Sequence, residues 1–307
     1  MNLNPKQFLN PDPLFCEKKS AAVAILPVPY EGGTSYGKGA ARAPFSVIES
    51  SYFLELFDEE LKAEPFRMGI MTALPPELPG NPSEVEDAIY GSARTLIEMG
   101  KYVVLLGGDH SISVGYFKAL LAAYGHISVI QFDAHADLRE SYDGSYFSHA
   151  CVMSRLRELT GDTLQMGIRS MSGKEAKRIE QENLSVYTMM ECRNNHDALI
   201  TAIESLPDPV FVTLDVDVFD WSVIRSTGTP EPGGFMWYEG LDLLRYIFYK
   251  KNVVGFDVVE LSYEENDRNS PFAVAKLIYK MLGFKLASKV DNGLMEWPKH
   301  PIGPIFD

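Results

Sequence analysis

Four short segments of the chain place acidic residues or histidine directly after an apolar run. They are LLGGDH at 105–110, QFDAHAD at 131–137, TLDVDVFD at 213–220 and GFDVVE at 255–260. Strands of a parallel sheet end together at one edge, and open α/β folds bind what they act on at that edge. The segments therefore predict a shared site, and their two histidines and several aspartates suit a pair of divalent metal ions.

The spacing within two segments favours convergence on metal. In DAHAD the residues Asp133, His135 and Asp137 alternate, so an extended backbone would direct all three side chains to one side. Asp215 and Asp217 repeat this spacing. The candidate metal ligands are His110, Asp133, His135, Asp137, Asp215 and Asp217.

One such motif alone more often marks a surface loop or a helix cap, so the prediction depends on the whole set. Four aspartates buried together without cations would be strongly destabilised or would protonate. The alternative is that the segments are solvated and unrelated, and the combined set favours the metals.

The ligand chemistry indicates the metal and the reaction. Many oxygen ligands, two imidazoles and no thiolate favour Mn²⁺ over Zn²⁺, and Mg²⁺ rarely takes histidine. Two such metals typically share a water and present it as a hydroxide nucleophile, which predicts hydrolysis. Four carboxylates and one hydroxide against two dications leave a charge of about −1, so we expect a cationic substrate.

The elements that must position these residues alternate between strand and helix patterns. Ser83 with Glu86 predicts a capped helix over 84–99 that stops at Gly100, and Ser270 with Pro271 predicts a helix that Gly283 closes. Strands are expected at 20–28, 102–106, 127–132, 209–214 and 252–257, with weaker candidates at 164–168 and 184–189. This order predicts a mostly parallel sheet with helices on both faces. The Gly- and Pro-rich stretch 29–44 reads as a long functional loop.

Composition predicts one soluble domain over residues 1–307, with terminal extensions at 1–20 and 285–307. The net charge of −14 argues against nucleic acid or an anionic membrane as partner. Three cysteines, Cys16, Cys151 and Cys192, lie far apart in no metal spacing, which is typical of free thiols in a reducing compartment. With no signal peptide and no apolar stretch long enough to span a membrane, we expect a cytoplasmic protein.

Several motifs together resemble the ureohydrolase family, the arginases and agmatinases. GGDHS, DAHADLR, LDVDVFD, STGTPEPGG and VVELS occur in that order, and the resemblance covers Val23 to Leu282. It implies a three-layer α/β/α arginase-like fold, two Mn²⁺ per subunit, and hydrolysis of a guanidino group to urea and an amine. It also implies a homo-oligomer, trimer or hexamer, and bridging roles for Asp133 and Asp215 among the six ligands.

The resemblance also assigns roles near the metals. Glu260 would bind the guanidinium, although a salt bridge at a strand end is the plainer alternative. His149 would bind substrate and shuttle a proton, against the alternative of a packed or helix-capping histidine. Asp137 would relay a proton while bound to metal, and Thr229 would line the guanidinium pocket. The remaining histidines, His126, His196 and His300, fall outside the motifs and are read as structural or surface residues.

The substrate expected first is agmatine, which would give putrescine for polyamine biosynthesis. Arginases recognise the amino-acid end of arginine with an Asn and an acid, where this chain has Arg139 and Ser172. Aminopropyl-agmatine, 4-guanidinobutyrate and arginine stay as alternatives, since Arg139 could pair with a carboxylate or form a loop salt bridge. Trp221 stands where relatives usually have Pro, a difference expected to alter the loop beside the pocket without touching the ligands.

Two other classes of protein were weighed. A deacetylase-like zinc amidohydrolase generally needs two adjacent histidines, and this chain has none. A catalytically silent homologue would usually have lost ligands, whereas all six are present.

Overall fold

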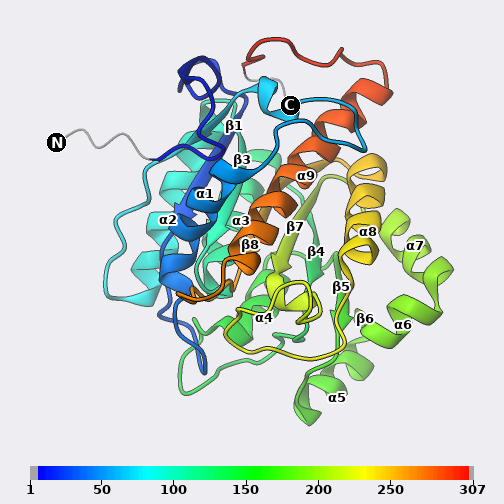
Figure 1. Ribbon diagram of the computed structural model, residues 1–307. Helices are drawn as coiled ribbons and strands as arrows, with labels where there is room; N and C mark the ends of the chain where they lie inside the picture. The colour runs from blue at the N-terminus through cyan, green and yellow to red at the C-terminus, as the bar shows by residue number, and fades with distance from the viewer. Residues whose placement is uncertain (1–5, 304–307) are drawn as a thin grey trace.

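The computed structural model describes residues 6–303, which contain one eight-stranded, entirely parallel sheet (Figure 1). The strands lie in the order β2-β1-β3-β8-β7-β4-β5-β6. Their bounds are β1 Val23–Val28, β2 Ile70–Thr72, β3 Tyr102–Gly107, β4 Ser128–Phe132, β5 Thr163–Ile168, β6 Ser185–Thr188, β7 Val210–Asp215 and β8 Val253–Val259.

Helices cover both faces of this sheet and give three layers, as the sequence predicts. The α-helices are α1 Ala43–Ser50, α2 Pro82–Glu98, α3 Ser113–Tyr124, α4 Val152–Arg157, α5 Gly173–Glu182, α6 Met189–Asn194, α7 His196–Ser205, α8 Trp237–Lys250 and α9 Asn269–Asp291. Side chains of α1, α6, α7, α8 and α9 pack in one apolar core, and those of α2, α3 and α4 pack in the other, with α5 at its margin.

The central strands are buried on both faces because each contributes alternate residues to the two cores. In β3, Val104 and Leu106 join the core under α9, whereas Val103 and Leu105 join the core under α3. This explains why the strands read as continuous apolar runs rather than as an alternating pattern.

The predicted delivery of ligands to one sheet edge is confirmed. The neighbouring strands β3, β8, β7 and β4 run parallel, so their carboxyl ends meet at the lower edge in Figure 1. The four acid-bearing segments span the ends of these four strands. The metal-ligand candidates therefore come from the ends of β3, β7 and β4, and Glu260 comes from the end of β8, which lies between β3 and β7.

Several local predictions were wrong. The N-cap of α2 is Asn81, whose side chain accepts a hydrogen bond from the Ser83 amide, so the predicted Ser83–Glu86 capping box does not form. Helix α9 continues past Gly283 to Asp291, and Lys285 is buried, so the predicted extension at 285–307 begins inside a packed helix. The edge strand β2 was not predicted, because it has only three residues. Residues 1–5 and 304–307 of the predicted extensions lie outside the described residues.

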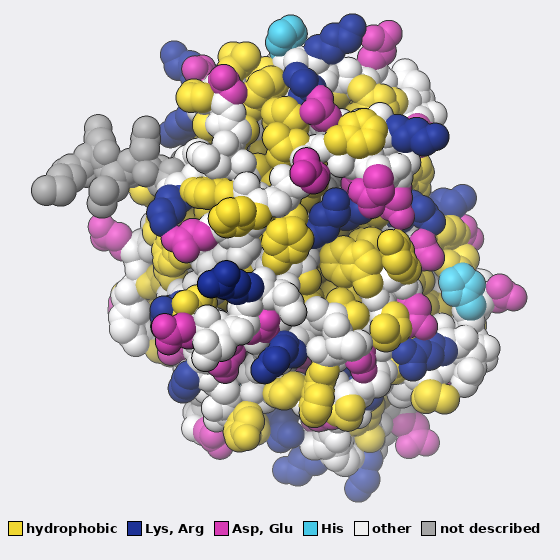
Figure 2. Space-filling view, viewed as in Figure 1, with side chains coloured by type: hydrophobic (Ala, Val, Ile, Leu, Met, Phe, Trp, Pro, Cys, Tyr) yellow, Lys and Arg dark blue, Asp and Glu magenta, His cyan; other side chains and the backbone are white. Residues whose placement is uncertain are grey.

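Among the helices of residues 6–303, none is long and apolar enough to cross a membrane. On the face of the molecule in Figure 2, acidic and basic side chains are interspersed, with hydrophobic side chains between them. Charge on this face is therefore mixed.

A close backbone crossing fixes the loop that carries His110. A Cβ built on Gly108 would lie 2.0 Å from the backbone oxygen of Tyr30, which also accepts a hydrogen bond from the Asp109 amide. Only glycine allows the segment after β3 to approach the segment after β1 this closely.

We expect Gly108→Ala to lower the free energy of unfolding by roughly 1–3 kcal/mol, because backbone on both sides must shift. Gly91→Ala, in the middle of α2 with no atom within 4 Å of its built Cβ, is the matched control and should stabilise slightly. Thermal denaturation of both variants checks this. A Gly108→Ala protein as stable as wild type would show that the close approach of residues 108 and 30 does not require glycine.

Candidate metal centre

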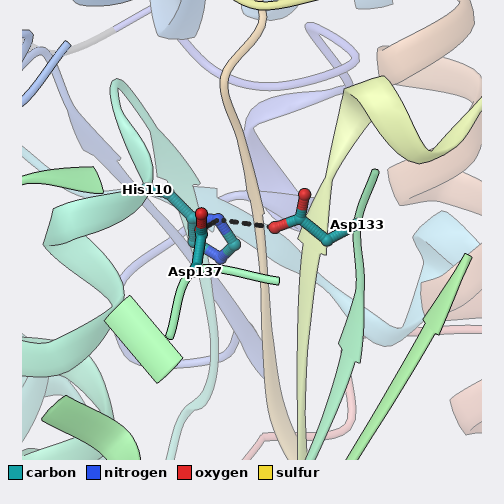
Figure 3. A group of neighbouring side chains, drawn as sticks. All are labelled: His110, Asp133 and Asp137. Carbon is teal, nitrogen blue, oxygen red and sulfur yellow. Dashed lines mark ion pairs between the residues drawn. The ribbon is translucent and has the colours of Figure 1, made fainter. Parts of the chain in front are cut away.

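The first group of candidate ligands surrounds His110, which opens the short helix His110–Ile112 directly after β3. Its Nδ1 lies 3.2 Å from Asp133 Oδ2, 3.4 Å from Asp137 Oδ2 and 3.5 Å from Asp215 Oδ2. Figure 3 shows the His110 ring directed towards Asp133, with Asp137 beside it. The structure thus brings one imidazole nitrogen and three carboxylates around a single point.

The second group forms around His135, on the loop that follows β4. His135 Nδ1 lies 2.9 Å from Asp217 Oδ2 and 3.7 Å from Asp133 Oδ1. Asp133 therefore directs one oxygen to each group, and in each case the candidate ligand atoms could share one metal ion. This is the arrangement that a bridging carboxylate between two metals requires. Asp215 faces the first group through Oδ2, and its Oδ1 accepts the Asp217 amide at 2.9 Å.

The two ligand loops are not extended, in contrast to the expected geometry. Asp137 adopts a left-handed backbone conformation with φ of 49°, which Asp tolerates better than most residues. The Asp133 carboxylate turns the chain by accepting the His135 amide at 2.6 Å. Asp215 and Asp217 lie at the start of, and within, the short helix Val216–Val218. Convergence therefore comes from tight turns at strand ends rather than from the alternation of a strand.

A buried relay orients the His110 ring. Its Nε2 lies 2.8 Å from Thr213 Oγ1, and the Thr213 hydroxyl donates to Asp257 Oδ1 at 2.8 Å. Because the Thr213 hydrogen goes to Asp257, the Thr213 oxygen must accept from His110 Nε2–H. That leaves Nδ1 facing the three carboxylates, where it can carry a proton or offer its lone pair to a metal ion.

Sequence reasoning missed this relay, although both of its residues stand in quoted segments. Asp257 lies within GFDVVE and Thr213 begins TLDVDVFD. Both are fully buried, and their role follows only from the neighbouring positions of β7 and β8, where Thr213 pairs with Asp257.

These residues fit a bound metal pair. His110 Nδ1 and Asp217 Oδ2 are buried and have no hydrogen-bond partner among the described residues. Nδ1 facing three carboxylates must either carry a proton, as the three carboxylates favour by outweighing burial and raising the pKa of His110 well above its ordinary value, or bind a cation that lies between them. Nitrogen and carboxylate oxygen donors without thiolate match Mn²⁺ chemistry.

Without metal, the pKa values of the clustered side chains depart strongly from their ordinary values. Burial raises the pKa of the Asp137 carboxyl, and Asp133 raises it further, to about 6. Burial and the neighbouring Asp217 also raise the pKa of Asp215 well above its ordinary value. Burial would lower the pKa of His135, but the carboxylates of Asp133 and Asp217 outweigh it and raise that pKa to about 12. In the metal-free protein, protons replace part of the missing positive charge.

Glu260 and His149 lie beside the ligands. Glu260 follows β8 with φ of 65°, a strained conformation for this residue type, and its Oε1 accepts the His110 amide at 2.7 Å. His149 Nδ1 lies 3.3 Å from the same oxygen, and its Nε2 lies 2.9 Å from Ser35 Oγ, on the predicted functional loop. Burial lowers the pKa of His149, but Glu260 reverses this and raises it to about 9.

A cavity of about 270 Å³ opens beside this cluster. Metal-ligand candidates His135 and Asp137, together with His149 and Thr229, line it. Its other lining residues include Ser35, Arg139, Tyr142, Met171, Ser172 and Glu175. Thr229 thus lies in the same cavity as His149, and its role in guanidinium binding stays a prediction. The histidines His126, His196 and His300 do not line it.

Replacing Thr213 with Val should weaken Mn²⁺ binding by about 10–100-fold, because the His110 ring loses the acceptor that holds its tautomer. Thr201→Val, on the surface of α7, is the matched control. Calorimetric titration of metal-free protein with Mn²⁺ measures both affinities. Equal affinities in the two variants would show that the relay does not orient His110.

In the metal-free protein we expect stability to rise as pH falls from about 8 to 5. The folded pKa of about 6 for Asp137 and about 9 for His149 exceed their ordinary values, so the folded state binds more protons than the unfolded state in this window. With Mn²⁺ bound the trend should reverse, because protons compete for the ligands. Chemical denaturation across this pH range measures the free energy of unfolding with and without Mn²⁺. If it changed with pH in the same direction in both cases, the cluster would not be the metal site.

Comparison with known proteins places this geometry in a family. The arginase family profile matches residues 21–283. An N(1)-aminopropylagmatine ureohydrolase of Synechocystis sp. is 40% identical over 91% of this chain and 94% of its own length. An agmatinase of Pyrococcus horikoshii is 34% identical over 86% of this chain and 92% of its own length.

Solved structures agree with the sequence comparison. The agmatine ureohydrolase of Thermoplasma volcanium superposes with a TM-score of 0.81 at 27% identity, covering 91% of this chain and 97% of that one. The matched profile spans all four ligand-bearing segments and the whole sheet. The chain belongs to the arginase family, and it is a ureohydrolase that acts on guanidino groups.

Proposed function

We propose that this enzyme hydrolyses the terminal guanidino group of a linear guanidino amine, agmatine first, to urea and the free amine. One observation carries the proposal: a buried carboxylate, Glu260, accepts the amide of the candidate ligand His110 and lies 3.3 Å from His149, which lines the cavity. A planar cation held by Glu260 would lie directly against the cluster of candidate metal ligands. Fixed geometry of this kind is the main requirement for attack on an unreactive guanidinium.

Each residue of this chain has a task in the proposed reaction. The six ligands would hold two Mn²⁺, which when bound lower the pKa of a water molecule. Glu260 pairs with the guanidinium nitrogens and orients the carbon towards the ligands. His149, 2.9 Å from Ser35 and 3.3 Å from Glu260, is positioned to give a proton to the leaving amine. Asp137, which lines the cavity next to His149, is the second candidate for carrying that proton.

The cavity wall also offers groups that could receive a second cation of the substrate. Glu175 and Tyr142 contribute a buried carboxylate and an aromatic face to its wall, and both attract ammonium groups. Agmatine would give putrescine, which would place the enzyme in polyamine biosynthesis. Aminopropyl-agmatine is the second candidate, because the Synechocystis relative at 40% identity is named for that substrate.

The remaining expectations belong to this proposal. Cys16, Cys151 and Cys192 are free thiols, which supports a reducing compartment such as the cytoplasm. A homo-oligomer, trimer or hexamer, stays a prediction that sedimentation of the Mn²⁺-loaded protein would test.

Urea release by Mn²⁺-loaded protein, assayed with agmatine, aminopropyl-agmatine, 4-guanidinobutyrate and arginine, tests the proposal. We expect activity on agmatine or its aminopropyl derivative, and a loss of about 10²-fold or more in kcat/KM for Glu260→Gln, because the guanidinium loses its ionic partner. Asp137→Asn, which removes a candidate metal ligand, is the inactive control of the urea assay. Thr201→Val serves as a variant far from the site.

Absence of urea from all four substrates, with two metals bound per chain, would reject the proposed substrate class. Unchanged kinetics in Glu260→Gln would instead remove Glu260 from guanidinium binding while leaving the reaction itself intact.

A further inference from the structure

The outer wall of the active-site cavity contains a rigid carboxylate. Glu175 is 4% exposed and lies in the first turn of α5. Its Oε1 accepts the Leu138 amide at 3.0 Å, and its Oε2 accepts the Ser172 amide at 2.7 Å. Leu138 directly follows the candidate ligand Asp137, so this carboxylate has a fixed place relative to the metal centre.

A cation of the protein itself faces that carboxylate. Arg139 Nε lies 3.8 Å from Glu175 Oε2, and the guanidinium carbon lies 5.0 Å from the centre of the Tyr142 ring. The Arg139 side chain is 40% exposed. Its guanidinium makes no hydrogen bond to residues 6–303, in contrast to Arg178, whose Nη1 donates to the Leu138 carbonyl at 3.1 Å.

The two partners of this contact therefore differ in mobility. Glu175 is held by two backbone amides, whereas Arg139 is held by one long, half-exposed ion pair and one aromatic contact. Pairs of the latter kind contribute little stability and are readily exchanged. Any other cation of suitable reach could take the place of Arg139.

Resting on the proposed function, we propose that Arg139 determines substrate specificity by occupying the subsite of Glu175 and Tyr142 that the distal ammonium of the substrate must enter. A substrate with a second cation displaces the Arg139 guanidinium into solvent. A substrate with a distal carboxylate pairs with Arg139 instead. A guanidine with no second charge leaves the internal pair intact.

Arg139 therefore biases which substrate binds, although the chemical step does not require this side chain. Arg139 weakens binding of dications by repulsion and competition, and it strengthens binding of guanidino acids by attraction. Removal of this side chain should therefore move the two substrate types in opposite directions. A merely structural arginine would move them together.

The test compares kcat/KM for agmatine and for 4-guanidinobutyrate, each divided by the value for butylguanidine, which has no distal charge. In Arg139→Gln we expect the agmatine ratio to rise and the guanidinobutyrate ratio to fall, each about two- to fivefold. The change should appear in KM rather than kcat, because Arg139 does not touch the reacting atoms. Arg139→Lys keeps the charge and should restore the guanidinobutyrate ratio.

Controls separate this effect from net charge and from turnover. Arg94→Gln removes an exposed arginine of α2, paired with Glu98, and should leave both ratios at the wild-type value. Calorimetric binding of butane-1,4-diamine measures the subsite without catalysis, and its affinity should rise about two- to fivefold in Arg139→Gln.

Ratios that stay constant or move in the same direction in Arg139→Gln, or an unchanged diamine affinity, would overturn the proposed role of Arg139. A wild-type enzyme that releases no urea from any guanidine would reject the proposed function, and the diamine titration would still decide on Arg139.

Discussion

Burial of four aspartates within one cluster is the constraint on which this structure depends. Asp133, Asp137, Asp215 and Asp217 are each at most 7% exposed and lie around two histidines. Two imidazolium groups balance only half of four negative charges, so a stable apo state must retain protons on some carboxylates. Uncompensated charges in such surroundings are strongly destabilising. Two divalent ions neutralise the cluster without that protonation, which makes metal binding and the local fold parts of one equilibrium.

Residues around the metals form a single hydrogen-bonded unit. The Asp257 carboxylate holds Thr213, and Thr213 holds the His110 ring. The His110 amide donates to Glu260, and the Glu260 amide donates to the Gly108 carbonyl. A change at the end of any of these strands therefore reaches both the metal ligands and the carboxylate proposed to bind the guanidinium. Metal affinity and substrate orientation depend on the same backbone positions.

A second chain of contacts joins the predicted functional loop to this unit. Asp109, next to His110, accepts the Gly33 amide at 2.6 Å, and the Gly33 carbonyl accepts the His149 amide at 3.3 Å. Ser35 on the same loop contacts the His149 ring. His149 is thus positioned by the segment after β1, although it lies far along the chain in the loop after β4. The long loop after β1 therefore positions His149, whereas the strand ends carry the candidate metal ligands.

Much of this arrangement could be predicted from the sequence, for a physical reason. Doubly buried parallel strands appear as plain apolar runs, and turns at their ends need polar ligands, so QFDAHAD and TLDVDVFD stand out. The details depended on tertiary structure. The left-handed turn at Asp137 and the short helix at Asp217 replaced the expected extended segments, because the ligands must curl over the strand ends to meet. Thr213 and Asp257 became partners only through the pairing of β7 and β8.

The cluster of candidate ligands and the cavity beside it are built on different physical principles. His110 and Glu260 in the cluster are buried and joined by a hydrogen bond between neighbouring strand ends, so we expect few substitutions there to keep the reaction. Cavity residues such as Arg139 and Tyr142 belong to the loop after β4 and are partly exposed, and Arg139 meets Glu175 only at 3.8 Å. Electrostatic contacts at that depth are weak and screened, so they alter substrate preference by small factors. A fold of this kind can therefore keep one hydrolytic centre while exposed loop residues determine which guanidine enters it.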